Sequence, residues 1–219
     1  MNFVISIVNP AARAAMCEIY NTLHLPLAVD IPGKGTAAEN MLELLGIESV
    51  EKHMFVTVAD RETTKELVSL HRKRLFTGVP GHGIVISIPV KSVGGGKTLA
   101  YLSQNKIPEK RAPEISPAYE LVIAIGNEGC TDTVMNAARA AGATGGTVIH
   151  GKGTGAKTDE KFYNVSIAKE KEVILIVAQS ERKAEIMKSV LEKAGPETPS
   201  GVIVFSLPVN ETAGFGMFE

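Results

Sequence analysis

An internal repeat is the feature that most constrains how this chain folds. A shift of 118 positions, lengthened to 119 by one inserted residue, brings the two halves of the 219-residue chain into nearly colinear register. The matched segments are Phe3–Asn9 with Leu121–Asn127, Gly33–Thr36 with Gly151–Thr154, Val58–Ala59 with Val177–Ala178, and Ser87–Val90 with Ser206–Val209. Such self-similarity indicates duplication of one structural unit. We therefore predict two domains, residues 1–100 and 118–219, joined by a linker over residues 101–117.

Each copy is predicted to run strand, helix, strand, strand, helix, strand. Short runs rich in Val and Ile indicate buried strands, and helical spacing with capping residues indicates the helices. The predicted segments are the strands Phe3–Val8, Met54–Val58, Ile84–Ile88, Leu121–Ile125, Glu172–Ala178 and Val202–Leu207, and the helices Ala11–Leu23 and Thr131–Ala141. Asp60 and Ser180 are expected to cap the remaining helices. This order predicts an α+β fold of two tandem ferredoxin-like βαββαβ domains.

The composition argues against several classes of function. A formal net charge of −1 gives no general attraction to nucleic acid, and the absence of Trp disfavours base stacking. No run of eighteen apolar residues is present and the N-terminus lacks a signal-peptide pattern, so we expect a cytoplasmic protein without membrane insertion. Cys17 and Cys130 are too few for a disulfide framework or a cysteine metal site, and they are expected to be small buried apolar residues.

Motifs for catalysis and metal binding are weak. The run Gly94–Thr98 is similar to a phosphate-binding loop of the Walker type, but position 91 holds Lys instead of the required glycine, so a linker turn is expected within Lys91–Pro117. The five histidines show no metal-ligand spacing. The basic run His71–Arg74 is expected to be a solvated helix end. No nucleophile is paired with a recognisable base, and we predict that the protein is not an enzyme.

Glycine-rich loops provide the candidate binding residues. In Thr77–Gly83 the glycines allow positive φ and close approach of backbone N–H groups to phosphate oxygens, and the hydroxyl of Thr77 and the imidazole of His82 can add contacts. The alternative is a tight helix-to-strand turn that needs glycine only for its shape. Lys34 and Lys152, in the two Gly-Lys-Gly-Thr segments, can neutralise phosphate as point charges. A turn at the start of a flexible loop is the alternative for both segments.

The segment Thr77–Val90 resembles the nucleotide-cradling B-loop of the P-II nitrogen-regulatory family, and Gly142–Gly155 resembles the strand that runs into the T-loop of the same family. The resemblance implies signal transduction in nitrogen regulation by a homo-oligomer, most often a trimer, that binds ATP or ADP in clefts between domains. It also implies control of a protein partner such as a transporter or a metabolic enzyme. No glutamine is found where the family holds 2-oxoglutarate through magnesium, so sensing of that metabolite stays open.

The family likeness assigns nucleotide-binding residues in both copies. They are Thr77, Gly78, Gly81, His82 and Gly83 of the first loop, Thr147 of the second copy, and the two repeated segments Gly33, Lys34, Gly35, Thr36 and Gly151, Lys152, Gly153, Thr154. The second copy has Pro196, Glu197 and Pro199 in its counterpart loop, so hybrid sites are expected, with the first copy's loop facing the second copy's strand. Two alternatives remain: a trimeric scaffold that binds metal weakly at His82 or His150, and a nucleotide-dependent transferase.

Overall fold

The computed structural model describes residues 1–36, 50–75, 77, 82–106, 118–153, 161–162, 165–166 and 170–214. The chain divides into two compact units. The first contains Met1–Gly33, Ala37–Tyr119 and Pro208–Glu219, and the second contains Lys34–Thr36 and Glu120–Leu207. Each unit therefore includes a short segment that belongs, by sequence, to the other copy.

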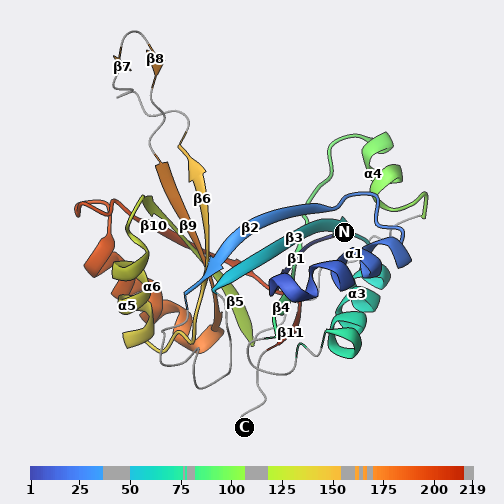
Figure 1. Ribbon diagram of the computed structural model, residues 1–219, viewed down its shortest axis with the longest axis horizontal. Helices are drawn as coiled ribbons and strands as arrows, with labels where there is room; N and C mark the ends of the chain where they lie inside the picture. Colours follow the sequence, from blue (N-terminus) through green and yellow to red (C-terminus); the bar gives the residue numbers. More distant parts are fainter. Residues whose placement is uncertain are drawn as a thin grey trace. The chain divides into compact units, whose positions relative to one another are not determined.

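The first unit is an antiparallel sheet with helices on one face (Figure 1). Its main elements are β1 (Asn2–Val8), α1 (Arg13–Thr22), β2 (Val29–Gly35), β3 (Glu51–Ala59), α3 (Arg61–Arg74), β4 (Ile84–Pro89) and β11 (Glu211–Ala213). The strands lie in the order β2-β3-β1-β4-β11. Without β11, this is the order of a ferredoxin-like sheet.

Local sequence explains where the helices of the first unit begin. Pro10 starts a short 3-10 turn, Pro10–Ala12, so α1 begins only at Arg13 instead of Ala11. The predicted cap of α3 is confirmed, because the Asp60 carboxylate accepts a hydrogen bond of 2.8 Å from the backbone N–H of Thr63. The cap fixes the direction in which α3 leaves β3.

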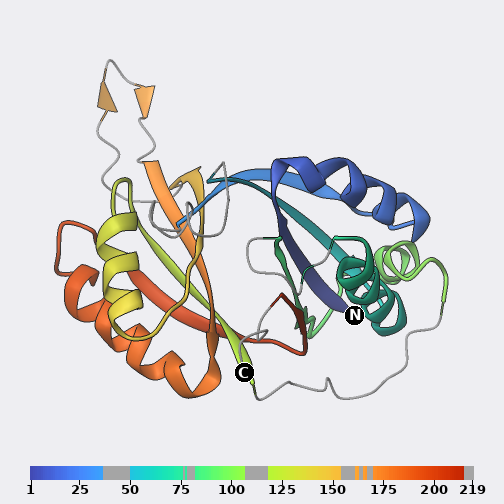
Figure 2. The same ribbon diagram turned by 60° about the horizontal axis from the view of Figure 1, so that its bottom comes forward.

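The second unit repeats the same order of elements. It contains β5 (Tyr119–Asn127), α5 (Thr131–Ala140), β6 (Thr147–Lys152), β9 (Glu170–Gln179), α6 (Ser180–Ala194) and β10 (Ile203–Pro208), and the strands lie in the order β10-β5-β9-β6. The two-residue strands β7 (Lys161–Phe162) and β8 (Val165–Ser166) follow β6 and precede β9 in the sequence, and they pair with each other in a separate two-stranded sheet. In Figure 2, α5 (yellow) and α6 (orange) lie side by side on one face of the sheet. Two tandem ferredoxin-like βαββαβ domains are thus confirmed.

Helix ends in the second unit differ in part from the prediction. Ser180 is the first residue of α6 and Gln179 holds the cap position without a side-chain hydrogen bond, so Ser180 is not the N-cap. Cys130 holds the cap position of α5, and Thr131 is the first residue of the helix, where its hydroxyl donates to a carboxylate. Gly142 follows the end of α5 with φ of +94°, as expected for a glycine that terminates a helix.

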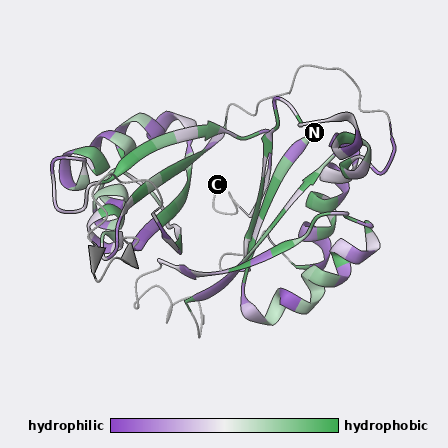
Figure 3. Ribbon diagram, turned by 90° about the horizontal axis from the view of Figure 1, so that it is seen from above, coloured by the Kyte–Doolittle hydropathy of each residue, from purple (hydrophilic) through white to green (hydrophobic). Residues whose placement is uncertain are grey.

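Each unit has its own apolar core between sheet and helices, visible as long apolar stretches in the strands of Figure 3. In the first unit Val4 and Val8 of β1 pack with Ile19 of α1 and Leu67 of α3. In the second unit Ile174 and Ile176 of β9 pack with Met135 of α5 and Ile186 of α6. Alternate strand residues therefore face the helices, which is the reason the runs of Val and Ile were readable as strands.

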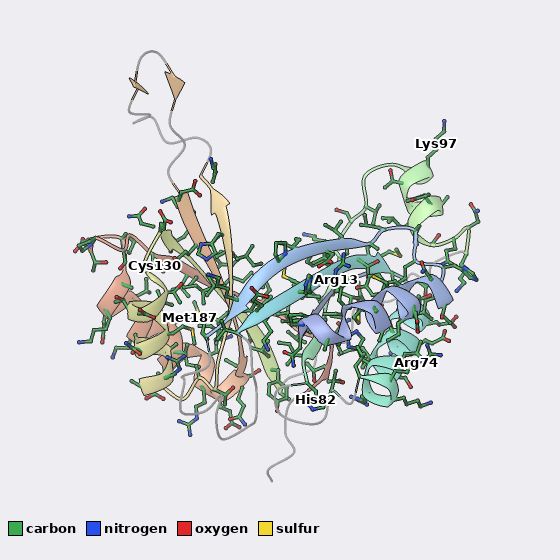
Figure 4. All side chains as sticks on the ribbon, in the orientation of Figure 1. Arg13, Arg74, His82, Lys97, Cys130 and Met187 are labelled. Atoms are coloured by element: carbon green, nitrogen blue, oxygen red, sulfur yellow. The ribbon has the colours of Figure 1, made fainter. Side chains whose placement is uncertain are left out.

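Two single-residue expectations are wrong. Cys17 lies on the exposed side of α1 instead of in the core, whereas Cys130 is buried as expected. His71 is fully buried, so the run His71–Arg74 is not a solvated face throughout; Figure 4 labels Arg74, which is exposed. Burial follows position on the helix more closely than local charge, because His71 lies one turn after Leu67 and Val68 on the core side.

The segment expected to be a linker turn is helical in part. Gly96–Leu102 forms helix α4, on which Lys97 projects away from the chain in Figure 4. The segment is attached to the end of α1, because the Tyr101 hydroxyl donates to the carbonyl of Pro26 at 2.6 Å and the Gln104 amide donates to that of His24 at 2.9 Å. Among the helices of the described ranges, none is both long and apolar enough to cross a membrane.

Candidate functional site

The glycine loop of the first unit connects α3 to β4. Of its predicted binding residues the structure describes Thr77, His82 and Gly83, whereas Gly78 and Gly81 lie outside the described residues. The side chain of His82 is exposed. The hydroxyl of Thr77 is buried, and among the described residues it has no hydrogen-bond partner. A buried hydroxyl without a partner is costly, and it is a group to which a ligand could offer an acceptor or donor.

The backbone at Gly83 requires glycine. Its φ is +115°, and a Cβ atom there would lie 2.5 Å from the carbonyl oxygen of Ile7 in β1. Gly83 is therefore used for close packing of the loop against the end of β1, as well as for its conformation. On the other side, a Cβ atom on Gly214, the residue after β11, would lie 2.6 Å from the Gly83 oxygen and 3.0 Å from the Thr77 oxygen. Gly214 thus packs directly against the backbone of Thr77 and Gly83.

His71 lies just before this loop, at the last turn of α3. Its carbonyl accepts a hydrogen bond from the backbone N–H of Leu75, and within the described part of the chain neither ring nitrogen has a partner. Burial lowers the pKa of His71 to about 4, so the imidazole is neutral at pH 7. Sequence reasoning grouped His71 with the neighbouring cations. Its spacing from Leu67 and Val68 was the signal that could have separated it from them.

The first Gly-Lys-Gly-Thr segment has a structural role in the second unit. Gly33 lies within β2, and the following Lys34 and Gly35 pair with Val148 and Thr147 of β6. The hydroxyl of Thr36 donates to the Gly146 carbonyl at 3.0 Å and accepts from the Gly146 N–H at 2.8 Å.

The Thr36 hydroxyl is therefore occupied by backbone groups. Arg139 adds a hydrogen bond to the Thr36 carbonyl. Thr147 is buried in this pairing, while Lys34 is exposed. Of the segment's polar side chains, Lys34 is the one that faces solvent.

The second Gly-Lys-Gly-Thr segment lies at the end of β6. Gly151 and Lys152 are the last residues of the strand, Gly153 follows it, and Thr154 lies outside the described residues. The Lys152 ammonium is 3.5 Å from the carboxylate of Glu170, and both side chains are largely exposed. Such a surface pair stabilises a protein by about 0–1 kcal/mol, so Lys152 can exchange this partner for an anion.

A pair of residues that sequence reasoning did not select joins the end of β5 to the start of β9. The Lys171 ammonium donates to the Asn127 side-chain oxygen at 2.7 Å, and Lys52 makes the same hydrogen bond to Asn9 in the first unit. These residues are counterparts in the repeat, because Asn9 and Asn127 end the first matched strands. The Glu-Lys pair that begins both β3 and β9 was the available signal. Burial lowers the pKa of Lys52.

Glu172 connects β9 to the start of α5. Its buried carboxylate accepts hydrogen bonds from the N–H groups of Gly129 and Thr131, both at 2.9 Å, and from the Thr131 hydroxyl at 2.6 Å. Burial acts to raise the pKa of Glu172, but the hydrogen bonds from Thr131 and Gly129 outweigh it and hold the pKa below its ordinary value. Burial, aided by this carboxylate, raises the pKa of the Cys130 thiol to about 11. Figure 4 labels Cys130.

The corresponding position in the first unit has different chemistry. His53, the counterpart of Glu172, lies 2.8 Å from the Asp30 carboxylate, which also accepts a 2.6 Å hydrogen bond from Arg13. Burial acts to raise the pKa of Asp30, and the hydrogen bonds from His53 and Arg13 lower it further than burial raises it. Both units thus tie the third strand of the repeat to polar groups near the first helix, with residues that diverged after duplication.

Comparison with known proteins identifies the family of one copy. Residues 119–215 match the family described as nitrogen regulatory protein P-II. No curated protein matches the chain. Among solved structures, the Bacillus subtilis GlnK–ATP complex is 14% identical, with a TM-score of 0.34 over 45% of this chain and 97% of that chain. An unknown protein from Galdieria sulphuraria is 12% identical, with a TM-score of 0.30 over 95% and 98% of the two chains.

A third structure, a Bacillus cereus protein related to NIF3, is 15% identical with a TM-score of 0.35 over 47% of this chain. This chain covers only 29% of that protein. At such scores the structural neighbours carry no argument, and the assignment depends on the family match. The class of protein is thus a tandem ferredoxin-like repeat. Residues 119–215 form a domain of the nitrogen regulatory protein P-II family.

Proposed function

We propose that this chain is a P-II-like signal-transduction protein that binds an adenine nucleotide, ATP or ADP, at the glycine loop of the first unit and controls a protein partner. The observation that carries the proposal is the arrangement at Thr77 and Gly83. Thr77 has a buried hydroxyl without a partner among the described residues, Gly83 of the same loop holds a positive φ, and by sequence this loop resembles a P-II nucleotide loop. The family match of residues 119–215 supports it, since P-II proteins are typically non-catalytic regulators.

The nucleotide class is proposed from the family, one of whose members, GlnK of Bacillus subtilis, was crystallised with ATP. In this chain, phosphate oxygens would accept from loop N–H groups and from Thr77, and the exposed His82 would add a donor when protonated. Lys34 and Lys152 belong to the second unit, where each is an exposed cation to which an anion could bind. The partner would be a transporter or a metabolic enzyme, and the active form a homo-oligomer, with a trimer as the family precedent.

The first unit's loop is preferred over its counterpart in the second unit for chemical reasons. Pro196 and Pro199 have no backbone N–H to donate, and the exposed Glu197 would repel a phosphate. Gly195 packs tightly, because a Cβ atom on it would lie 2.4 Å from the Leu191 carbonyl oxygen. We propose that this second loop binds no nucleotide.

A thermal-shift comparison with matched variants tests the site. ATP and ADP at about 100 times their dissociation constant should stabilise the folded chain by about 2.7 kcal/mol. His82→Glu places a negative charge at the first loop and should weaken nucleotide binding at least about tenfold. Ser200→Glu makes the same change at the second loop and should leave binding within about twofold. Equal effects of the two variants would refute the site, and no stabilisation by either nucleotide would refute the ligand class.

The scaffold alternative has one observation in its favour. The hydroxyl of Thr36 and the backbone of Lys34 and Gly35 are used for strand pairing in the second unit, so this segment has a structural role that requires no ligand. A ligand-independent scaffold predicts that Thr77→Val, which removes only the unpaired hydroxyl, leaves all interactions with small molecules unchanged. The nucleotide proposal predicts weaker ATP or ADP binding with undiminished stability. Calorimetry on the variant separates the two.

A further inference from the structure

The last strands of the two copies, β4 and β10, are counterparts with different surroundings. β4 is flanked on its outer side by β11, and Ile86 in its middle is 1% exposed. β10 ends its sheet, and within the described ranges no strand lies beyond it. Phe205, the counterpart of Ile86, is 39% exposed, and the neighbouring Ile203 is 54% exposed. An open edge strand with large apolar side chains invites pairing with another segment.

The repeat indicates which segment fits that edge. β11 belongs to the segment Asn210–Gly214, which follows β10 in sequence, and the shift of 119 makes Lys91–Gly95 its counterpart after β4. Both segments follow a Pro-Val pair, and both end in a glycine with positive φ, +84° at Gly95 and +102° at Gly214. Asn210–Gly214 is paired with β4, whereas Lys91–Gly95 is mostly exposed and forms no strand with the described residues.

The polar contacts between β11 and the β4 edge show which groups a similar contact at the β10 edge would require. Asn210 donates to the Asn2 side chain at 2.9 Å and lies against the Ser87 hydroxyl at 2.5 Å, and Asn2 donates in turn to Thr64 at 3.2 Å. This network is uncharged.

At the vacant edge the counterparts of these residues carry charges. Asn2 is replaced by Glu120, Thr64 by Lys183 and Asn210 by Lys91, whereas Ser87 remains a serine, Ser206. Lys183 already pairs with Glu120 at 2.5 Å, and Ser206 also bonds that carboxylate. A carboxylate accepts several donors, so Glu120 can receive the Lys91 ammonium as well.

We propose that the β10 edge binds the segment Lys91–Gly95 of a second copy of this chain. By the register of β11 on β4, in which Thr212 faces Ile86, Val93 of the incoming segment lies opposite Phe205 and covers it. Lys91 then reaches Glu120 and Ser206. Charge complementarity at Glu120 favours Lys91 at this edge, while the uncharged Asn2 suits Asn210 at the other, so each segment has its own edge.

The contact is head to tail, because the vacant β10 edge and the unpaired segment Lys91–Gly95, both in the described part of each chain, are different surfaces. Copies would therefore add in one direction until the arrangement closes into a ring. The inference specifies the self-association included in the proposed function, but it requires no nucleotide. Its tests are made without nucleotide, so a negative result leaves the binding proposal standing, and absence of nucleotide binding leaves the interface standing.

Disulfide trapping tests the register. Chains carrying Cys17→Ser and Cys130→Ala, one with Val93→Cys and the other with Phe205→Cys, are co-expressed and oxidised mildly. Cross-strand neighbours are close enough for a disulfide, so a covalent dimer between the two chain types is expected. Val93→Cys with Ile203→Cys, two residues out of register, should give far less. Equal yields for the two pairs, no dimer, or an intrachain bond when Val93→Cys and Phe205→Cys share one chain would overturn the proposal.

Sedimentation equilibrium tests the charge contact. The unmodified chain should self-associate, and Lys91→Glu should raise the dissociation constant at least about tenfold, because it puts a carboxylate against Glu120. Lys97→Glu makes the same charge change six residues later on the exposed side of α4, and it should shift the constant by less than about twofold. A monomeric wild-type chain, or equal effects of Lys91→Glu and Lys97→Glu, would overturn the proposed interface.

Discussion

Substitution of His71 should reveal a stability term that depends strongly on pH. The imidazole is fully buried, both ring nitrogens lack a partner among the described residues, and burial lowers its pKa from 6.5 to about 4. Between these values the unfolded chain binds a proton that the folded chain does not bind. Stability is therefore intact above pH 6.5 and is lost as the pH falls toward 4. The difference between the two pKa values corresponds to about 3.4 kcal/mol of unfolding free energy, of which about 2 kcal/mol is lost by pH 5.

Urea denaturation at pH 7.5 and pH 5.0 measures this term. In the wild type the free energy of unfolding of the first unit should drop by about 2 kcal/mol from His71 alone, whereas His71→Leu should lack this drop. His71→Leu should also be at least as stable at pH 7.5, since the ring nitrogens it removes make no hydrogen bond to the described residues. His82→Leu, at an exposed histidine, should keep the wild-type pH dependence. An unchanged pH dependence in His71→Leu would refute the reasoning.

Three further substitutions test separate parts of the structure. Gly83→Ala should destabilise the first unit by about 2 kcal/mol or more, because its Cβ meets the Ile7 carbonyl and φ is positive, while Gly94→Ala, with open space around it, should change the melting temperature little. Glu172→Gln should lower the free energy of unfolding by about 1–3 kcal/mol, because its hydrogen bonds to Gly129 and Thr131 are weaker, and it should reduce the loss of stability below pH 4.5. The exposed Glu170→Gln should change neither quantity. Denaturation between pH 3 and 7 compares the two variants. Asn127→Ala should destabilise the second unit by about 1 kcal/mol, measured by chemical denaturation, and Lys171→Ala should add little to it if their hydrogen bond is the common cause.

Much of the fold was predictable because the sequence pattern of each strand and helix occurs twice, once in each copy of the repeat. The strands around Phe3–Val8 and Leu121–Ile125 could be read from their apolar runs, and Asp60 was identifiable as a cap from residue type alone. The burial of His71 was not predicted, because the adjacent basic residues Arg72–Arg74 suggested a solvated helix end, whereas the helical spacing from Leu67 indicated the core side. The exposure of Cys17 was also missed, because it depends on which side of α1 faces the sheet.

The candidate site was less accessible to sequence reasoning. A Gly-Lys-Gly-Thr segment looks the same whether it binds a ligand or pairs with a strand, and only tertiary structure shows that Thr36 is held by Gly146. The pairs Lys52–Asn9 and Lys171–Asn127 join residues more than forty positions apart, so periodicity alone could not connect them. Their recurrence at equivalent positions was the one sequence signal that pointed to a shared role.

The stoichiometry of nucleotide binding tests the central claim most directly. Isothermal titration of the 219-residue wild-type chain with ADP should give one site per chain, because the loop at Thr77 and Gly83 is competent and its counterpart with Pro196 and Glu197 is not. Two equivalent sites per chain would show that the counterpart loop also binds, and the absence of heat at millimolar ADP and ATP would show that neither does. Either result would contradict the account.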